Sequence, residues 1–366
     1  MNWREKLKDN VSDVKGLMQY LPMSSQEAER IGRILEKYPM SITPYYLSLI
    51  NREDEKDPIR RMCVPSLQEE SVQGSFDTSG EADNTVIVGM QHKYKQTALI
   101  LSTSCCSMYC RHCFRKRFVG TSDDEIAKHL HEMVDYIQRH KEITNVLISG
   151  GDSFLLSNKK IENYLTVFSG MEQLDFIRFG TRTPVVFPQR ISEDPELLEI
   201  LKKYGRKKQI YVVTQFNHTR EFTQEAKAAV QSLQKCGVVL RNQAVLLRGV
   251  NDTPKEMGAL FKKLTSWGIA PYYVFQCRPV VGVKSQFQVP IEEGHRIVKE
   301  ARSMQNGLGK HLRYCLSHPS GKIEIVGKLP GGEMIFKYHE AKHDADQGRI
   351  FTKKLSAHQC WLEHNQ

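Results

Sequence analysis

Three cysteines carry the strongest chemical signal in this sequence. Cys106, Cys110 and Cys113 stand in a C-x3-C-x2-C spacing. Three thiolates can hold three irons of a four-iron cluster, which leaves the fourth iron free to bind the amino and carboxylate groups of a ligand. The spacing therefore predicts a [4Fe-4S] cluster with one open iron.

A zinc knuckle is the structural alternative for these cysteines. Such sites usually use two C-x2-C pairs, or a cysteine pair with a histidine pair. The other cysteines are scattered, apart from one that adjoins the cluster: Cys63, Cys105, Cys236, Cys277, Cys315 and Cys360. Consecutive residues rarely both reach one cluster, so we interpret Cys105 as a packing residue. The pattern favours iron and sulfur over zinc.

The composition is that of an ordinary globular protein. Of 366 residues, 40% are hydrophobic and 26% are charged. The N-terminal segment is charged and lacks the apolar core of a secretory signal, and no apolar run approaches the ~20 residues of a bilayer span. The nine cysteines are an odd number without an export signal, which favours reduced thiols over disulfides. We therefore expect a cytoplasmic protein without a membrane partner.

The formal net charge of +10 raises the question of a nucleic-acid partner. Lysines and arginines are scattered over most segments, and only residues 111–117 are densely basic. Nucleic-acid binding usually shows clustered basic tracts or a broad basic face. We favour a solvated basic surface with a site for anionic small molecules, and expect no nucleic-acid partner.

From Thr97 onward, short apolar runs alternate with amphipathic stretches, which is typical of repeated βα units and a parallel sheet. The predicted strands are 98–102, 145–148, 176–179, 209–213, 238–247 and 272–275, and the predicted helices are 123–140, 157–170, 193–204, 221–235, 253–267 and 291–305. Six units are fewer than the eight of a full barrel. We therefore predict an α/β fold, an open, partial TIM-like (βα)6 barrel with its chemistry at the strand C-termini.

The segments on either side complete the predicted domain organisation. We expect a helical extension and linker over residues 1–96, with a loop at 65–90, then the barrel over 97–306. Residues 307–366 form a C-terminal segment with a hairpin pattern around a Pro-Gly-Gly turn, and Lys322 stands at the foot of its first strand.

The segment from Cys106 to Arg117 resembles the signature of radical S-adenosylmethionine (SAM) enzymes, and specifically of the lysine 2,3-aminomutase family. Further segments resemble family motifs in family order and span most of residues 40–322. They are Pro44–Ile50, Asp57–Arg61, Ser149–Asp152, Thr183–Val186, Pro188–Ile191, Phe216–His218, Asn242–Gln243 and Gly249–Asp252. The resemblance implies a cluster that cleaves SAM to a 5′-deoxyadenosyl radical, and an isomerase that moves an amino group within an amino acid.

The resemblance also assigns residues to SAM. His112 matches the family position whose ring lies against the adenine, a contact that suits a flat ring. Ser149, Gly150, Gly151 and Asp152 match the glycine-rich segment that receives the methionyl end. Taken alone, Ser-Gly-Gly-Asp would be interpreted as a tight βα turn with a helix cap.

Pyridoxal 5′-phosphate (PLP) and substrate residues follow from the same resemblance. Lys322 matches the family lysine that forms a Schiff base with PLP, and only a primary amine can make that bond. Gln243 matches a residue that contacts the PLP phosphate. Arg115 matches the arginine that holds the substrate α-carboxylate, a planar contact that lysine does not reproduce.

The sequence departs from the lysine-specific pattern at the distal end of the substrate. Arg278 and Cys315 stand where lysine-specific members place two aspartates around the substrate ammonium. A buried arginine facing an ammonium is unfavourable, which argues against lysine and for an acidic amino acid. The alternative is that Arg278 turns away into a structural ion pair. Thr253 replaces a family zinc-binding cysteine, so we do not expect the zinc site of the family.

Two other functions stay open at this stage. One is a radical SAM enzyme of the same family that acts on a protein lysine or another substrate, without PLP. The other is a non-catalytic metal-binding or RNA-associated protein, for which the sequence offers only the short basic loop around Cys113. For the enzyme, we expect a small amino-acid substrate and a reducing protein such as flavodoxin or ferredoxin. Whether the chain forms a homo-oligomer stays open.

Overall fold

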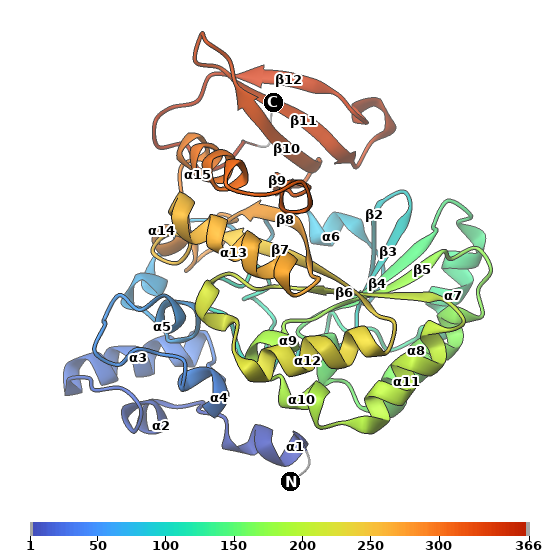
Figure 1. Ribbon diagram of the computed structural model, residues 1–366, viewed down its shortest axis with the longest axis horizontal. Helices are drawn as coiled ribbons and strands as arrows, with labels where there is room; N and C mark the ends of the chain where they lie inside the picture. The colour runs from blue at the N-terminus through green and yellow to red at the C-terminus, as the bar shows by residue number, and fades with distance from the viewer. Residues whose placement is uncertain (1–2, 364–366) are drawn as a thin grey trace. The chain divides into compact units, whose positions relative to one another are not determined.

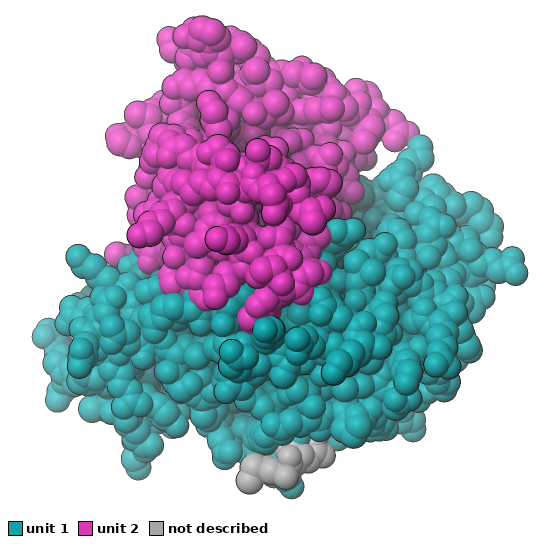
Figure 2. Space-filling view, viewed as in Figure 1, with its two compact units in different colours: residues 1–67, 85–215, 220–241 teal, residues 68–84, 216–219, 242–366 magenta. Residues whose placement is uncertain are grey.

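The computed structural model describes residues 3–363. The chain divides into two compact units, coloured separately in Figure 2. Unit 1 comprises residues 1–67, 85–215 and 220–241, and unit 2 comprises residues 68–84, 216–219 and 242–366. The cysteine cluster and the predicted SAM residues belong to unit 1. The predicted PLP residues Gln243 and Lys322, together with Arg278, belong to unit 2.

Unit 1 begins with short helices, as the sequence predicted. They are α1 (Trp3–Lys6), η1 (Leu7–Asp9), α2 (Val14–Met18), α3 (Ser25–Lys37), α4 (Pro44–Leu47) and α5 (Pro58–Cys63). Two of them begin at family-like motifs for a local reason. The side chains of Thr43 and Asp57 accept hydrogen bonds from backbone amides of the first turn, and a proline occupies the following position. These caps fix where α4 and α5 start.

The predicted loop at residues 65–90 was partly wrong. It contains η2 (Leu67–Glu70), α6 (Glu81–Asn84) and β1 (Thr85–Ile87), and β2 (Met90–Tyr94) begins at its end. In unit 1, β2 pairs antiparallel with both β1 and β3. The β2 sequence Met-Gln-His-Lys-Tyr is mostly polar and only its first two residues are buried. An edge hairpin of this kind leaves no apolar run to detect.

The predicted parallel strands of unit 1 are confirmed. β3 (Thr97–Leu101), β4 (Asn145–Ser149), β5 (Phe176–Gly180) and β6 (Gln209–Thr214) pair in parallel in chain order. The helices are α7 (Leu130–Arg139), η3 (Ser153–Leu155), α8 (Asn158–Ser169), α9 (Thr183–Val186), α10 (Gln189–Ser192), α11 (Pro195–Gly205) and α12 (Gln224–Lys235). α8 and α11 lie side by side along the outside of unit 1 (Figure 1).

The predicted helix at 123–140 was too long at its N-terminal end, because α7 begins at Leu130. The preceding residues are tied to the first parallel strand instead. The amide of Ala127 donates to the carbonyl of Leu101 at 2.7 Å, and Ile126 joins the small core beside that strand. A backbone that pairs with β3 does not form the helical i to i−4 hydrogen bonds.

Unit 2 holds the later helices and the C-terminal strands. The helices are α13 (Pro254–Ser266), α14 (Lys284–Phe287), α15 (Ile291–Ser303), η5 (Leu308–Lys310) and η6 (Asp344–Asp346). The strands are β8 (Ala270–Gln276), β9 (Arg313–His318), β10 (Gly321–Lys328), β11 (Met334–Ala341) and β12 (Ile350–Lys353). Three elements contain residues of both units: η2, η4 (Thr219–Glu221) and β7 (Val239–Leu246).

The predicted C-terminal hairpin is the pair β10 and β11, with its turn at the Pro-Gly-Gly segment. β9 pairs antiparallel with β10 on one side and in parallel with β8 on the other, and β12 extends the pair at β11. Over the described residues the strand order follows the chain order without closing on itself, so the sheet is open. In the same range, each helix is too short or too polar to cross a bilayer.

Candidate active site

Parallel strands place four functional segments at one edge of unit 1. The carboxyl ends of neighbouring parallel strands lie at the same edge of a sheet, where binding loops are usually built. The cysteine loop follows β3, the Ser-Gly-Gly-Asp turn follows β4, Arg182 follows β5, and Gln215 follows β6. The strand order therefore brings together residues that are up to about a hundred positions apart in sequence.

The cysteine loop is anchored by the N-terminal helices of unit 1. The amide of Arg111 donates to the carbonyl of Met62 at 2.9 Å, and its buried guanidinium donates to the carbonyl of Pro39 at 2.9 Å. Cys106 and Cys113 pack against a small apolar core at the end of β3, formed by Leu101, Phe118, Val119 and Ile126. The loop thus has a fixed backbone around its thiols.

Burial separates the three cysteines of the motif from the neighbouring Cys105. Cys106, Cys110 and Cys113 are half-buried, whereas Cys105 is exposed, so the interpretation of Cys105 as a packing residue was wrong. Three thiolates are the donor set that a [4Fe-4S] cluster with one open iron would use.

Electrostatics in the loop oppose bare thiolates. Burial, with a smaller contribution from the thiol of Cys110, raises the pKa of Cys113 to about 11. Burial also raises the pKa of Cys106 well above its ordinary value, with contributions from Asp152 and the other two thiols. Metal ligation must therefore displace protons from this loop, as it does at thiolate sites generally.

The Ser-Gly-Gly-Asp turn is joined to the start of the cysteine loop. The amide of Gly151 donates to the carbonyl of Thr103 at 2.5 Å, and the amide of Asp152 donates to the carbonyl of Cys105 at 2.8 Å. Gly150 has φ of +125°, and a Cβ on either glycine would lie 2.3 Å from one of these carbonyl oxygens. Only glycine permits this approach of two backbones.

Asp152 is buried, and groups of the chain itself fill most of the hydrogen-bond acceptor positions of its carboxylate. Its Oδ1 accepts from Thr181 Oγ1 and from the amide of Phe154, and its Oδ2 accepts from the amide of Arg182. Burial raises its pKa, whereas these hydrogen bonds act in the opposite direction. A carboxylate has about four acceptor positions. The contacts above fill at least three of them, and the helix cap expected from sequence alone is also present, because η3 begins here.

Arg115 and His112 flank this turn from the cysteine loop. Arg115 is 5% exposed, and its Nη1 donates to the carbonyl of Gly150 at 3.3 Å. The amide nitrogen of Gln215 donates to Nε2 of His112 at 2.9 Å. Burial lowers the pKa of His112 well below its ordinary value, and two nearby cations lower it further. The ring is therefore a neutral, flat imidazole.

Sequence reasoning missed a buried ionic group beside Cys110. Nη1 of Arg182 donates to Cys110 Sγ at 2.8 Å, and its Nη2 donates to Glu221 Oε1 at 2.5 Å. The hydroxyl of Tyr46 donates to the same carboxylate at 2.6 Å. Arg182 directly precedes one family-like motif and Tyr46 lies inside another, so the motifs held a signal for these two. Glu221 lies outside the motifs.

In unit 2, Lys322 lies on β10 within a polar and aromatic group. Its ammonium pairs with Glu340 on β11 and lies 4.6 Å from the ring centre of Tyr273. His339 Nε2 is 2.7 Å from the Tyr273 hydroxyl. Burial raises the pKa of that hydroxyl well above its ordinary value. Burial also lowers the pKa of His339, and the charge of Lys322 adds to the effect.

The other predicted residues of unit 2 lie on β7 and β9 or directly after β8. Arg278 follows β8, and its Nη2 donates to the hydroxyl of Ser317 on β9 at 2.8 Å. Cys315 is buried, which raises the pKa of its thiol. Gln243 is half-buried on β7 beside Asn242, whose side chain pairs with both backbone groups of Phe216.

Comparisons with known proteins identify the family. Residues 100–261 match the model of the Radical SAM superfamily. The chain is 39% identical to L-lysine 2,3-aminomutase of Fusobacterium nucleatum, covering 84% of this chain and 71% of that protein. It is 38% identical to L-lysine 2,3-aminomutase of Clostridium subterminale, covering 90% and 76%. It is 35% identical to glutamate 2,3-aminomutase of Clostridioides difficile, again covering 90% and 76%.

The chain belongs to the lysine 2,3-aminomutase family. The prediction made from the motifs is thus confirmed, and the α/β architecture is the radical SAM fold. Family membership implies a [4Fe-4S] cluster and SAM as cofactors. The lysine and glutamate 2,3-aminomutase activities are those of the relatives, and the assignment of individual residues in this chain stays a prediction.

Proposed function

We propose that this protein is a radical SAM, PLP-dependent amino-acid 2,3-aminomutase, an isomerase, whose substrate is an acidic amino acid rather than lysine. The observation that carries the proposal is the cysteine loop at the strand edge of unit 1 in a chain whose relatives are 2,3-aminomutases. In this proposal, residues 97–306 form a partial (βα)6 barrel and residues 307–366 form the segment that carries PLP.

Cys106, Cys110 and Cys113 would hold the cluster, which when loaded supplies the electron that cleaves SAM. His112 would hold the adenine, because its buried ring is neutral and Gln215 fixes its orientation. The turn from Ser149 to Asp152 would receive the methionyl end. The carboxylate of Asp152 would accept a hydrogen bond from the ammonium group of the methionyl end.

Lys322 and Gln243 would hold PLP, which when bound supplies an electron-delocalising ring attached to the substrate amine. Lys322 suits this role because its side chain is 12% exposed and therefore shielded from water. Arg115, buried beside the glycine turn, would hold the α-carboxylate of the substrate.

Arg278 supports an acidic substrate. Its Nη2 donates to the hydroxyl of Ser317, which is a neutral acceptor. A guanidinium binds a distal carboxylate and repels the ammonium of lysine. The glutamate 2,3-aminomutase among the relatives shows that acidic substrates occur in this family.

Two assays test the proposal. In the first, anaerobically reconstituted protein receives SAM, PLP, a strong reductant and either glutamate, aspartate or lysine, and mass spectrometry measures the β-amino isomer. We expect an acidic amino acid to react at least tenfold faster than lysine. Arg278→Gln should lose this preference, whereas the control Arg313→Gln, on neighbouring β9, should keep it. Turnover of lysine without turnover of acidic substrates would contradict the charge argument.

In the second assay, absorption spectra separate the alternatives. We expect a broad iron-sulfur band with a PLP shoulder that is absent in Lys322→Ala and present in Lys328→Ala, a control on the same strand with an exposed lysine. The broad band alone would favour a family member that acts without PLP on a protein lysine or another substrate. A colourless zinc protein would overturn the enzyme proposal.

The cellular setting is part of the same proposal. All nine cysteines lie within the described residues and are free thiols, which suits a cytoplasmic enzyme. The cluster would receive its electron from a reducing protein such as flavodoxin or ferredoxin. A pull-down with reduced flavodoxin and size-exclusion chromatography would examine the electron donor and the oligomeric state.

A further inference from the structure

We infer that unit 1 contains a second metal site, formed by His92, His140 and Glu142, which binds a divalent transition-metal ion of the Zn²⁺ type. The three residues come from separate parts of the chain: His92 lies on β2, His140 ends α7, and Glu142 lies in the turn before β4. One ligand atom from each lies within 4.8 Å of the other two. This inference is independent of the proposed function.

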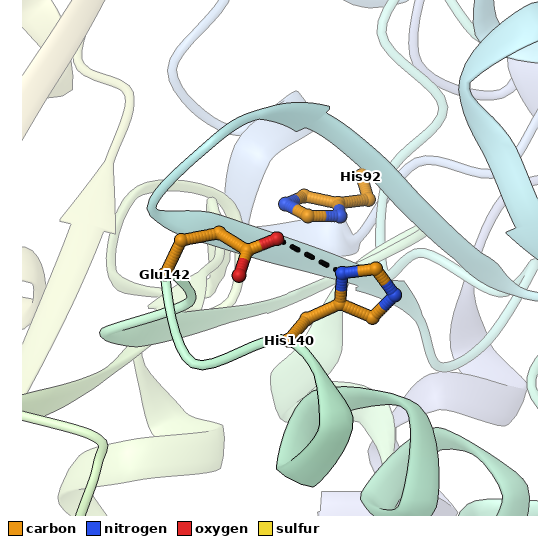
Figure 3. Close-up of side chains that lie close together, drawn as sticks. All are labelled: His92, His140 and Glu142. Atoms are coloured by element: carbon orange, nitrogen blue, oxygen red, sulfur yellow. Dashed lines mark hydrogen bonds and ion pairs between the residues drawn. The ribbon is translucent and has the colours of Figure 1, made fainter.

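The three side chains converge (Figure 3). The Glu142 carboxylate points toward the His140 ring, and the His92 ring lies next to both. The rings of His92 and His140 meet edge to face, with centroids 5.5 Å apart and an interplanar angle of 79°. All three residues are partly exposed, so an ion with its bound water can reach them.

His92 is held in the tautomer that a metal ligand requires. Its Nε2 lies 3.1 Å from the carbonyl oxygen of Lys95, which can only accept, so this nitrogen carries the hydrogen. Its Nδ1 therefore accepts a hydrogen bond from the hydroxyl of Tyr136 at 3.0 Å, and a metal ion would take the place of that hydroxyl at the lone pair. Histidine ligands of metals commonly donate their other N–H to a backbone carbonyl in this way.

His140 and Glu142 form the other half of the site. Nδ1 of His140 lies 2.9 Å from Oε1 of Glu142. The ring of Tyr136 stacks on the imidazole at 4.0 Å with an angle of 21°, which restricts its rotation. The carboxylate of Glu142 is partly exposed, so it can meet an ion that arrives from solvent. A bound cation would replace the hydrogen between these two residues.

The donor set selects the class of ion. Two imidazole nitrogens and one carboxylate oxygen suit zinc and neighbouring divalent metals rather than Ca²⁺ or Mg²⁺, which prefer oxygen ligands. Tetrahedral ligation requires ligand atoms about 3.3 Å apart. Glu142 lies in a turn and can move by the ångström or so that this contraction needs. Water would fill the open position.

Binding would join the β2 hairpin to the connection between α7 and β4. These segments are far apart in the chain, and the side chains that link them here are polar and partly exposed. Because the ion binds the folded arrangement of its ligands, it stabilises the fold in proportion to its occupancy. The site would thus link these two segments and stabilise this part of unit 1.

The test must keep the cysteines occupied, since zinc also binds thiolates. Cluster-loaded protein is given one equivalent of Zn²⁺, and X-ray absorption at the zinc edge measures the ligand distances. We expect a nitrogen and oxygen shell at about 2.0–2.1 Å without the sulfur shell at about 2.3 Å. A sulfur shell would place the zinc on cysteines and overturn the proposal.

Calorimetric titration of Zn²⁺ into the same holoprotein assigns the ligands. We expect the affinity to fall at least tenfold in His92→Ala, His140→Ala and Glu142→Gln, and to stay unchanged in the control His131→Ala, an exposed histidine on α7. Glu142→Gln keeps the size of the side chain and guards against a variant that fails to fold. Zinc should raise the melting temperature only where it binds. Wild-type affinity in the three site variants would overturn the proposal.

Discussion

The guanidinium of Arg182 is directed at the sulfur of Cys110 by contacts on its other sides. Nη1 lies 2.8 Å from the sulfur, Nε donates to the carbonyl of Gln215 at 3.1 Å, and Nη2 reaches Glu221 at 2.5 Å and the hydroxyl of Tyr46 at 3.2 Å. Burial alone would lower the pKa of Arg182, but Cys110, Tyr46 and Glu221 together raise it well above its ordinary value. A permanent cation therefore touches a predicted ligand of the cluster.

This contact predicts an effect on the reduction potential of the cluster. Hydrogen bonds to ligand sulfurs and nearby positive charge favour the reduced form. Removing the cation should lower the midpoint potential by on the order of 50 mV, given that 59 mV corresponds to a tenfold change in a one-electron equilibrium. The single variant Arg182→Gln would leave the buried carboxylate of Glu221 without its cation. The informative variant is therefore the double variant Arg182→Gln with Glu221→Gln, which removes both charges.

A redox titration followed by electron paramagnetic resonance measures this shift. The control Glu221→Gln keeps the contact between Arg182 and Cys110, and its potential should stay closer to that of the wild type. Equal potentials in the control and the double variant would show that the arginine has no influence on the cluster.

The adjacent cysteines should behave differently on substitution. Cys105 is exposed, and its backbone carbonyl accepts from the amide of Asp152. Cys106 packs against the small core at the end of β3, and the thiols of Cys110 and Cys113 help to raise its pKa. Cys106→Ser should lose the cluster, because two thiolates do not hold it firmly. Cys105→Ser should keep wild-type iron and sulfide content after anaerobic reconstitution. Loss of iron in the Cys105 variant would contradict the assignment of ligands.

The sequence predicted elements best where burial leaves an apolar run. Strands β3 to β6 are buried, and the runs marked them to within a residue or two. β2 was missed because most of its residues are polar, and the start of α7 was misplaced because the backbone of Ala127 pairs with Leu101. Both errors come from tertiary hydrogen bonds that a periodic pattern does not contain.

For the candidate site, the sequence likewise predicted the local motifs but not the contacts between distant segments. The cysteine spacing and the glycine turn are local features, so the sequence displays them. The group of Arg182, Tyr46 and Glu221 joins residues from three segments, and a motif marks the position of Tyr46 but not its contact with the other two. Likewise, the pairing of Lys322 with Glu340 depends on the register of β10 against β11, which brings these two residues opposite each other.

The glycine turn should not tolerate a side chain. An alanine Cβ at Gly151 would lie 2.3 Å from the carbonyl oxygen of Cys105, and both groups belong to backbone that is held by hydrogen bonds. Gly151→Ala should lower the free energy of unfolding by about 1–3 kcal/mol, as overpacking typically does. Urea denaturation monitored by circular dichroism gives this value. In the control Gly307→Ala the Cβ meets nothing within 4 Å, and stability should hold or rise. Equal stability of the two variants would contradict the close approach.

Glu340 should oppose the reaction of Lys322 with PLP. The carboxylate pairs with the Lys322 ammonium and favours its charged form, whereas the neutral amine is the form that reacts with an aldehyde. Glu340→Gln should therefore reach half-saturation at a several-fold lower PLP concentration in an absorption titration, since ~1 kcal/mol corresponds to about a fivefold change in affinity. Glu324→Gln is the matched control, because Glu324 lies on β10, the strand of Lys322, and pairs with Arg313 instead. Weaker PLP binding in Glu340→Gln than in this control would mean that the carboxylate holds the cofactor or positions the lysine, which would reverse its assigned role.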